Sequence, residues 1–193
     1  IQWNPATDEV EVVNYSAGTH KGLTAKVQIL NMDASVAWEK EATVDSNEDT
    51  TNKCIKLAFP ANLSKVHFIK MVLTENGKVV SDNFYHRSLE ENNYQDLRQL
   101  AKVALQSTTT VDKNADGTWS AVSVIENKTS TPALMIRLNV VGSKDGQQLL
   151  PVFYSDNYFS LLPGEKKEVR MSWKDEDTRG NEGKVLITGY NVE

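Results

Sequence analysis

Apolar and polar residues alternate with a period of two along most of the chain. The clearest run spans residues 23–29, and the same alternation recurs at 134–140 and 169–174. The apolar positions of the first run are Leu23, Ala25, Val27 and Ile29. Successive side chains of a strand point to opposite faces, so each run predicts a β-strand with one face in a core and the other in solvent.

Shorter runs of the same kind predict further strands. They cover residues 9–13, 55–59, 66–74, 79–85, 119–125, 149–154 and 185–190. Between the runs lie dipeptides that favour tight turns, namely Asn76-Gly77, Asp116-Gly117, Asp145-Gly146 and Pro163-Gly164. Short strands at this spacing, joined by such turns, predict an all-β fold of antiparallel hairpins packed as sandwiches.

An internal repeat divides the chain. The segment Val-Val-Asn-Tyr-Ser at 12–16 and the segment Ile-Glu-Asn-Lys-Thr at 125–129 each precede one of the long alternating runs. We therefore predict two copies of one sandwich module, residues 1–88 and 101–193, joined by a connector at 89–100. This connector is the only stretch with helical spacing, and its apolar residues at every third position are Tyr94, Leu97 and Leu100.

Composition and charge narrow the classes of function. The 193 residues include 21 Lys and Arg against 26 Asp and Glu, a net charge of −5, so no basic field exists to hold nucleic acid or an anionic membrane surface. No apolar stretch approaches the roughly 18 residues of a membrane span. The chain begins at Ile1 with no signal or transit segment, so we expect a folded, soluble fragment of a larger protein whose localisation is not readable from this end.

Residues with reactive side chains are few. Cys54 lies in an alternating segment and is expected to be an inert, half-buried strand residue, because a reactive thiolate needs basic neighbours in a cleft. His20, His67 and His86 stand far apart, without a partner at metal-ligand spacing. We interpret them as hydrogen-bonded or solvated side chains, and we expect no metal or other cofactor.

Residues 112–117 match the first half of a calcium-binding EF-hand loop. Asp112, Asn114 and Asp116 alternate before Gly117, but the twelfth position is Ser123 instead of the bidentate glutamate. Strand spacing follows where an EF-hand has a helix. The segment is therefore predicted to be the tip of a hairpin.

The sequence offers no active site of its own. Glycoside hydrolysis needs two carboxylates held about 5 to 10 Å apart in a pocket, and no spacing singles out such a pair among the 26 acidic residues. No nucleophile-elbow, zinc-protease, dinucleotide or phosphate-loop motif is present. A sugar-stacking aromatic platform is one interpretation, and packing in the cores is the other, for Trp3, Trp38, Trp119, Trp173, Tyr154, Tyr158 and Phe159.

One segment is a candidate contact loop. Asp156 and Asn157 favour a turn, because their side chains bond nearby backbone amides and tolerate left-handed φ. Tyr158 and Phe159 then add apolar area that a solvated loop has no internal reason to carry. A contact with another domain is one explanation, and Phe159 capping the sandwich core is the other.

A family resemblance enters at residues 149–165, which read Leu-Leu-Pro-Val-Phe-Tyr-Ser-Asp-Asn-Tyr-Phe-Ser-Leu-Leu-Pro-Gly-Glu. This run resembles the last immunoglobulin-like domain of family 2 glycoside hydrolases of the β-mannosidase and exo-β-glucosaminidase type. Further similar features are Asn14, Asn127, 81–85, 94–100 and 188–191. Two positions depart from the family, since His86 and Tyr190 stand where tryptophan is frequent, and this leaves the sugar open.

The resemblance implies two tandem immunoglobulin-like β-sandwich domains that buttress the catalytic (β/α) barrel of the same parent chain and shape its entrance. It places the catalytic glutamates on that barrel, and no residue here matches them. It also implies a parent glycosidase that is secreted or periplasmic, with carbohydrate as a second candidate partner.

Two other functions stay open at this point. An autonomous carbohydrate-binding module would carry an exposed row of aromatic rings on one sheet face. A cell-surface adhesion tandem would carry calcium-binding carboxylates between its domains, and only residues 112–117 point in that direction.

Overall fold

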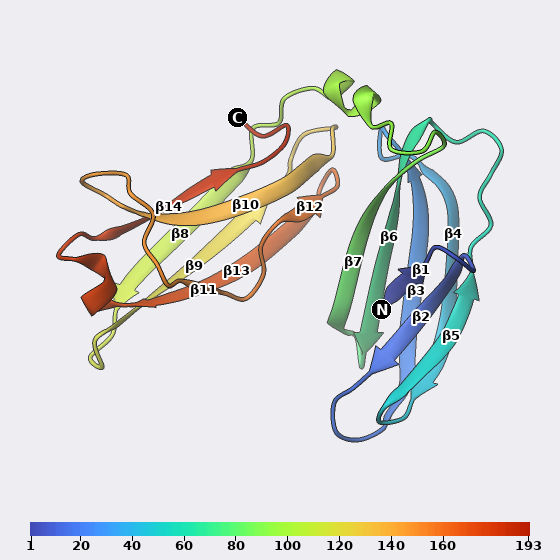
Figure 1. Cartoon of the computed structure of the whole chain (residues 1–193), viewed down its shortest axis with the longest axis horizontal. Coiled ribbons are helices and arrows are strands. Elements are labelled where there is room, and N and C mark those ends of the chain that lie inside the picture. Colours follow the sequence, from blue (N-terminus) through green and yellow to red (C-terminus); the bar gives the residue numbers. More distant parts are fainter. The chain divides into compact units, whose positions relative to one another are not determined.

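The computed structural model describes residues 1–193, and nearly all of its regular secondary structure is antiparallel β-strand (Figure 1). The chain divides into two compact units, Ile1–Gln99 and Leu100–Glu193. Each unit contains two sheets and its own hydrophobic core. The all-β class with two tandem immunoglobulin-like sandwiches is thereby confirmed.

The first unit pairs a three-stranded sheet with a four-stranded sheet. The three-stranded sheet has the order β1–β2–β5, with bounds Gln2–Asn4, Glu9–Asn14 and Thr50–Lys56. The four-stranded sheet has the order β4–β3–β6–β7, with bounds Val36–Ser46, His20–Asn31, Val66–Glu75 and Lys78–Ser88. Asn76 and Gly77 both have positive φ, as the predicted two-residue turn between β6 and β7 requires.

The second unit has the same plan with a different division of strands. One sheet has the order β11–β13–β9–β8, with bounds Phe153–Tyr154, Lys166–Lys174, Thr118–Glu126 and Gln106–Lys113. The other has the order β12–β10–β14, with bounds Phe159–Leu161, Ala133–Gly142 and Gly183–Thr188. Residues 114–117 connect β8 to β9, so the calcium-loop look-alike is a hairpin tip, as predicted.

The predicted strand faces form the two cores. Alternate residues of β3, from Leu23 to Ile29, are buried in the first unit, and alternate residues of β10, from Leu134 to Val140, are buried in the second. Trp173 is buried on β13 in phase with Val169 and Met171, as its spacing predicted. Burying these apolar faces between the two sheets of each unit is the main favourable contribution to folding.

Several strands differ from the sequence-based expectation. Strand β4 carries three consecutive charged residues, Glu39, Lys40 and Glu41, and β8 is exposed at every position, so neither edge strand shows clear alternation. The strand expected at 55–59 instead ends at Lys56. The strand expected at 149–154 is reduced to Phe153–Tyr154, because Pro151 has no N–H to donate to a sheet.

Two short 3₁₀ helices complete the fold. η1, Gln95–Gln99, lies within the predicted connector and contains no buried residue. The three-residue apolar spacing of the connector, from Tyr94 through Leu97 to Leu100, suits a helix with three residues per turn, although only Leu97 lies within η1. η2, Asp175–Thr178, follows β13. Neither helix is long or apolar enough to cross a membrane.

Candidate functional site

The predicted contact loop of the second unit is fixed to the sandwich by Asn157. The side-chain Oδ1 of Asn157 accepts a hydrogen bond from Leu138 N at 2.8 Å, and Nδ2 donates to Leu138 O at 3.0 Å. This amide thus pairs with β10 as a backbone peptide of a neighbouring strand would. The loop is also tied to β13, because Ser155 N donates to Arg170 O at 2.8 Å and Ser155 Oγ accepts from Arg170 N at 2.9 Å.

A second side chain, that of Tyr154, forms a hydrogen bond with the same edge of β10. Tyr154 Oη accepts a hydrogen bond from Val140 N at 3.2 Å, and Leu149 N donates to Val140 O at 2.9 Å. Burial raises the pKa of Tyr154, so the phenol stays protonated at neutral pH. Side chains and loop backbone therefore satisfy the β10 edge beyond the short strand β12.

The two aromatic residues of the loop have different environments. Phe159 is the first residue of β12, is only 8% exposed and belongs to the core, so of the two explanations the structure supports capping of the sandwich core for this residue. Tyr158 is 60% exposed, with φ of 59°, and Arg137 lies 5.9 Å from its ring centroid. Asp156 forms an ion pair with Lys167. Tyr158 is therefore the one loop residue that presents apolar area to solvent.

The other aromatic candidates do not form one platform. Trp3 and Trp38 pack against the first core, and Trp119 stacks on buried Trp173 in the second, with ring centroids 6.4 Å apart. Tyr154 also packs against the second core. These residues are packing elements, as the alternative interpretation held.

The remaining chemical candidates also have structural surroundings. Cys54 Sγ donates to Val10 O at 3.3 Å, and burial raises its pKa, which disfavours the reactive thiolate. His67 is fully buried with Nδ1 3.2 Å from Ser64 O, and His86 packs edge-on to Phe68 and Phe84. Nowhere in the structure do three or more His, Cys, Asp or Glu residues gather in a way that could hold a metal ion.

The first unit contains a cleft that the sequence did not reveal. It has a volume of about 530 Å³ and lies where the end of β2 and the start of β3 approach β7. Its floor is apolar, from Val12, Leu23 and Leu73. The polar and aromatic lining residues include Asn14, Tyr15, Ser16, His20, Ser81, Asn83 and Tyr85.

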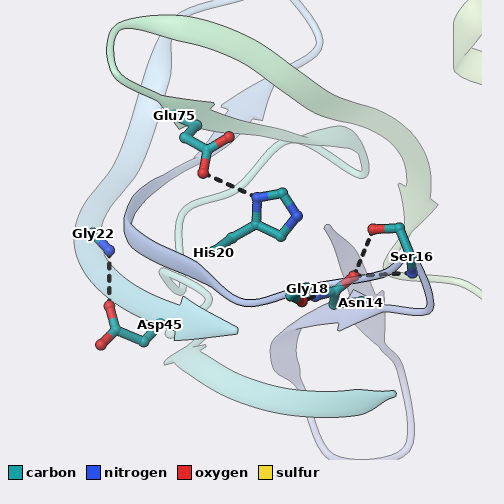
Figure 2. A network of polar contacts seen from close by, with 7 residues as sticks. All are labelled: Asn14, Ser16, Gly18, His20, Gly22, Asp45 and Glu75. Carbon is teal, nitrogen blue, oxygen red and sulfur yellow. Dashed lines mark hydrogen bonds and ion pairs between the residues drawn. The ribbon is translucent and has the colours of Figure 1, made fainter. Parts of the chain in front are cut away.

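A network of polar contacts shapes this cleft (Figure 2). A bulge in the pairing of β3 with β4 lies between His20 and Leu23, where Gly22 has φ of 66° and donates its N–H to Asp45 Oδ1 at 2.7 Å. Bulges re-aim the side chains beside them. His20 Nδ1 lies 2.9 Å from Glu75 Oε1, and Figure 2 shows the His20 ring between Glu75 and the turn that begins at Asn14.

The turn at Asn14 forms the other wall. Asn14 Oδ1 accepts hydrogen bonds from Ser16 N at 3.0 Å and Ser16 Oγ at 2.8 Å, and Nδ2 donates to Gly18 O at 3.0 Å. Tyr15, between these residues, is 87% exposed at the mouth of the cleft. The turn thus holds an exposed aromatic ring beside a set of hydrogen-bonding groups.

This cleft lacks the chemistry of a glycosidase active site. None of its lining residues is Asp or Glu, whereas glycoside hydrolysis uses a pair of carboxyl groups. Glu75 reaches it only through His20. The arrangement suits binding better than bond cleavage.

The fold and these surfaces define a protein built from tandem immunoglobulin-like sandwiches. The sequence pattern of the family described as the exo-β-D-glucosaminidase Ig-fold domain matches residues 83–192. The chain therefore belongs to this family of exo-β-D-glucosaminidase Ig-fold domains.

Relatives and solved structures agree with this assignment. The chain is 30% identical to an exo-β-D-glucosaminidase of Streptomyces avermitilis, over 100% of this chain but 24% of the relative. It superposes on exo-chitosanase CsxA of Amycolatopsis orientalis with a TM-score of 0.92 and 26% identity, over 99% of this chain and 25% of that chain. The resemblance to the exo-β-glucosaminidase type is confirmed.

The likeness to β-mannosidases is more distant. A β-D-mannosidase of Dictyoglomus thermophilum has a TM-score of 0.58 at 14% identity, over 97% of this chain and 22% of that chain. Such a match shows a shared fold alone. The β-mannosidase type named in the predicted resemblance is thus similar to this chain in fold only.

Sequence reasoning found the loop and missed the cleft. The glycine that interrupts alternation just before Leu23, together with the Asn-x-Ser pattern at 14–16, was the available signal for a shaped turn near His20. The contribution of β7 had no local signal, because Ser81 and Asn83 reach the cleft only through sheet pairing.

Proposed function

We propose that this chain is a non-catalytic accessory region of an exo-β-D-glucosaminidase-type glycoside hydrolase. It supports the catalytic barrel of the same parent chain, and the Tyr158 loop contacts that barrel near its entrance. Two findings support the proposal: the chain belongs to the Ig-fold domain family, and it spans only 24% of the first relatives. The absence of acidic residues from the cleft lining supports the non-catalytic part.

The observation that carries the contact is the way Tyr158 is held. Hydrogen bonds between Asn157 and β10 and between Ser155 and β13 fix the loop to one strand of each sheet. Tyr158 nevertheless leaves 60% of its side chain in solvent, and Arg137 lies beside its ring. Ordered aromatic and arginine side chains are enriched at the centres of protein interfaces, where little entropy remains to be lost.

Tyr158→Ala in the full-length parent tests this contact. We expect KM to rise or kcat to fall by about fivefold or more, since loss of one interface aromatic costs about 1 kcal/mol or more. The melting temperature of the 193-residue chain should hardly change, because the ring is exposed. Steady-state kinetics on a glucosaminide and thermal unfolding of the isolated chain give the two readouts.

Tyr190→Ala is a matched control, because Tyr190 is also an exposed tyrosine of the second unit. It should leave the kinetics of the parent unchanged. If Tyr158→Ala instead unfolds the isolated chain and leaves the kinetics of the parent unaltered, Tyr158 is a folding residue and the contact proposal is wrong.

A further inference from the structure

The exposed ring of Tyr15 is not explained by the turn that carries it. The second unit makes the same turn at Asn127, where Oδ1 accepts from Thr129 N at 3.1 Å and from Thr129 Oγ1 at 2.8 Å. The residue between them there is Lys128, a charged side chain near Glu126. Because the turn forms equally well around a lysine, folding does not require the aromatic side chain of Tyr15.

Exposed apolar side chains lie around Tyr15 at the mouth of the cleft. Val13 and Val80 also line the cleft and are exposed. Exposed apolar side chains that cluster at the rim of a hollow mark a binding surface more often than scattered ones do. A volume of about 530 Å³ is within the range of small-ligand sites.

The polar groups of the cleft suit a ligand rich in hydroxyl groups. A carboxylate only accepts hydrogen bonds, so Nδ1 of His20 donates to Glu75, and Nε2 is left to bond a hydroxyl group of a ligand, which can donate or accept. Ser16 Oγ donates to Asn14 Oδ1, Ser81 Oγ accepts from the terminal ammonium of Ile1 at 3.0 Å, and Asn83 Nδ2 donates to Ile1 O at 2.7 Å. A hydroxyl both donates and accepts and an amide has a carbonyl oxygen as well, so each of these side chains can form a further hydrogen bond around the same hollow. No Lys or Arg side chain lines it, and the terminal ammonium of Ile1, which does line it, donates to Ser81 Oγ, so phosphate or sulfate groups would lack a Lys or Arg partner there.

We propose that this cleft is a binding site for a pyranose unit of a β-linked polysaccharide. The ring of Tyr15 stacks on the apolar face of the sugar, and His20 and the neighbouring amide and hydroxyl groups bond its hydroxyls. The choice of glucosamine as the first probe rests on the proposed function; the site itself rests on the cleft. The accessory region would then hold polysaccharide at a point distinct from the Tyr158 loop.

Titration of the 193-residue chain with a tetramer of β-1,4-linked glucosamine, followed by NMR, tests the site. We expect a dissociation constant of about 1 mM, suited to a shallow site with few contacts. Shifts should concentrate in residues 14–22 and 80–85 and in the side-chain amides of Asn14 and Asn83. Cellotetraose, which has the same ring linkage without ammonium groups, tests whether the pyranose or its charge is recognised.

Three variants separate stacking from folding. Tyr15→Ala should weaken binding about tenfold, the loss of roughly one favourable aromatic contact. Tyr15→Phe keeps the ring and should stay within about twofold of the unchanged chain. Tyr158→Ala is the control in the other unit and should bind as the unchanged chain does.

The outcomes are distinct from those of the Tyr158 experiment. Binding of either tetramer at these residues, with loss in Tyr15→Ala, supports a pyranose site. Shifts elsewhere, no binding of either sugar, or equal binding by Tyr15→Ala would overturn it. If sugar does not bind and the cleft amides are protected from exchange in the full-length parent, the cleft is a contact with the rest of that chain. That result would overturn the sugar site and leave the Tyr158 contact to its own test.

Discussion

Asn14 and Asn127 hold the same turn in the two units, but the two side chains differ in their hydrogen-bond partners and in the structure that covers them. Asn127 is fully buried, and its Nδ2 donates both to Thr131 O at 2.8 Å and to Leu161 O at 3.0 Å, on β12. Asn14 donates to Gly18 O alone and lines the cleft. The repeated asparagine turn is therefore fully buried and bonded to a neighbouring strand in the second unit, whereas it forms one wall of the cleft in the first.

The strands that follow these turns differ in a related way. In the first unit, β3 is flanked by two long strands, β4 and β6. In the second, β10 has β14 on one side and only the three-residue β12 on the other, where Asn157 and Tyr154 complete the edge. The comparison shows that two copies of one module acquire different surfaces through their edges, while their inward faces stay alike.

The largest expected effect concerns the shared inward face. Leu138→Ala should lower the free energy of unfolding of the second unit by about 2 to 4 kcal/mol, because a buried leucine loses transfer free energy and leaves a cavity. Arg137→Ala, one residue away on the opposite face, should cost under about 0.5 kcal/mol. Urea unfolding followed by NMR signals of each unit measures both, and equal losses would show that the strand phase is wrong.

The next effect tests the two asparagine turns directly. Asn127→Ala should cost the second unit about 2 to 3 kcal/mol, since it removes hydrogen bonds from a fully buried site and leaves Leu161 O without that donor. Asn14→Ala should cost the first unit only about 1 to 2 kcal/mol, because water in the cleft can replace part of what is lost. The same unit-resolved urea titration compares them. Equal losses would mean that the hydrogen bond from Asn127 to β12 contributes little to the stability of the second unit.

The smallest effect is a difference in pH dependence. All three histidines belong to the first unit, and burial lowers the pKa of His67 and of His86. The unfolded chain therefore binds protons that the folded unit does not. The contribution of these two histidines to the free energy of unfolding of the first unit should thus be fully present above about pH 6.5 and be lost as the pH drops below it.

Unit-resolved thermal unfolding at about pH 7.5 and about pH 5.5 measures this difference. The second unit has no histidine and should hardly change in this range. His86→Phe keeps a ring against Phe68 and Phe84 and should reduce the pH slope of the first unit. An equal loss in both units would show that groups other than these histidines control the response.

The sequence predicted the parts of the fold that depend on local alternation. The inward faces of β3, β10 and β13, the turn at Asn76-Gly77 and the repeated asparagines all follow from patterns within about ten residues. The edge strands β4 and β8 were not predicted, because strands at a solvent-facing edge need no alternation of apolar and polar residues. The repeat also indicated the two sandwich modules before any pairing was known.

The candidate sites were less accessible to sequence reasoning. The loop at 155–159 was found through its composition, but the opposite fates of Tyr158 and Phe159 depend on where β12 begins. His20 was interpreted as one more solvated or satisfied histidine, and its contact with Glu75 does satisfy it. Its place in a cleft depends on pairing across 55 residues, which no local pattern encodes.

Asn157 has a further consequence for the behaviour of the protein in concentrated solution. An open strand edge recruits strands from other molecules and leads to edge-to-edge aggregation. Asn157 and Tyr154 occupy the backbone groups of Leu138 and Val140 that would otherwise attract such a strand. The surface beside β10 can therefore carry an exposed ring such as that of Tyr158 without also offering a template for self-association.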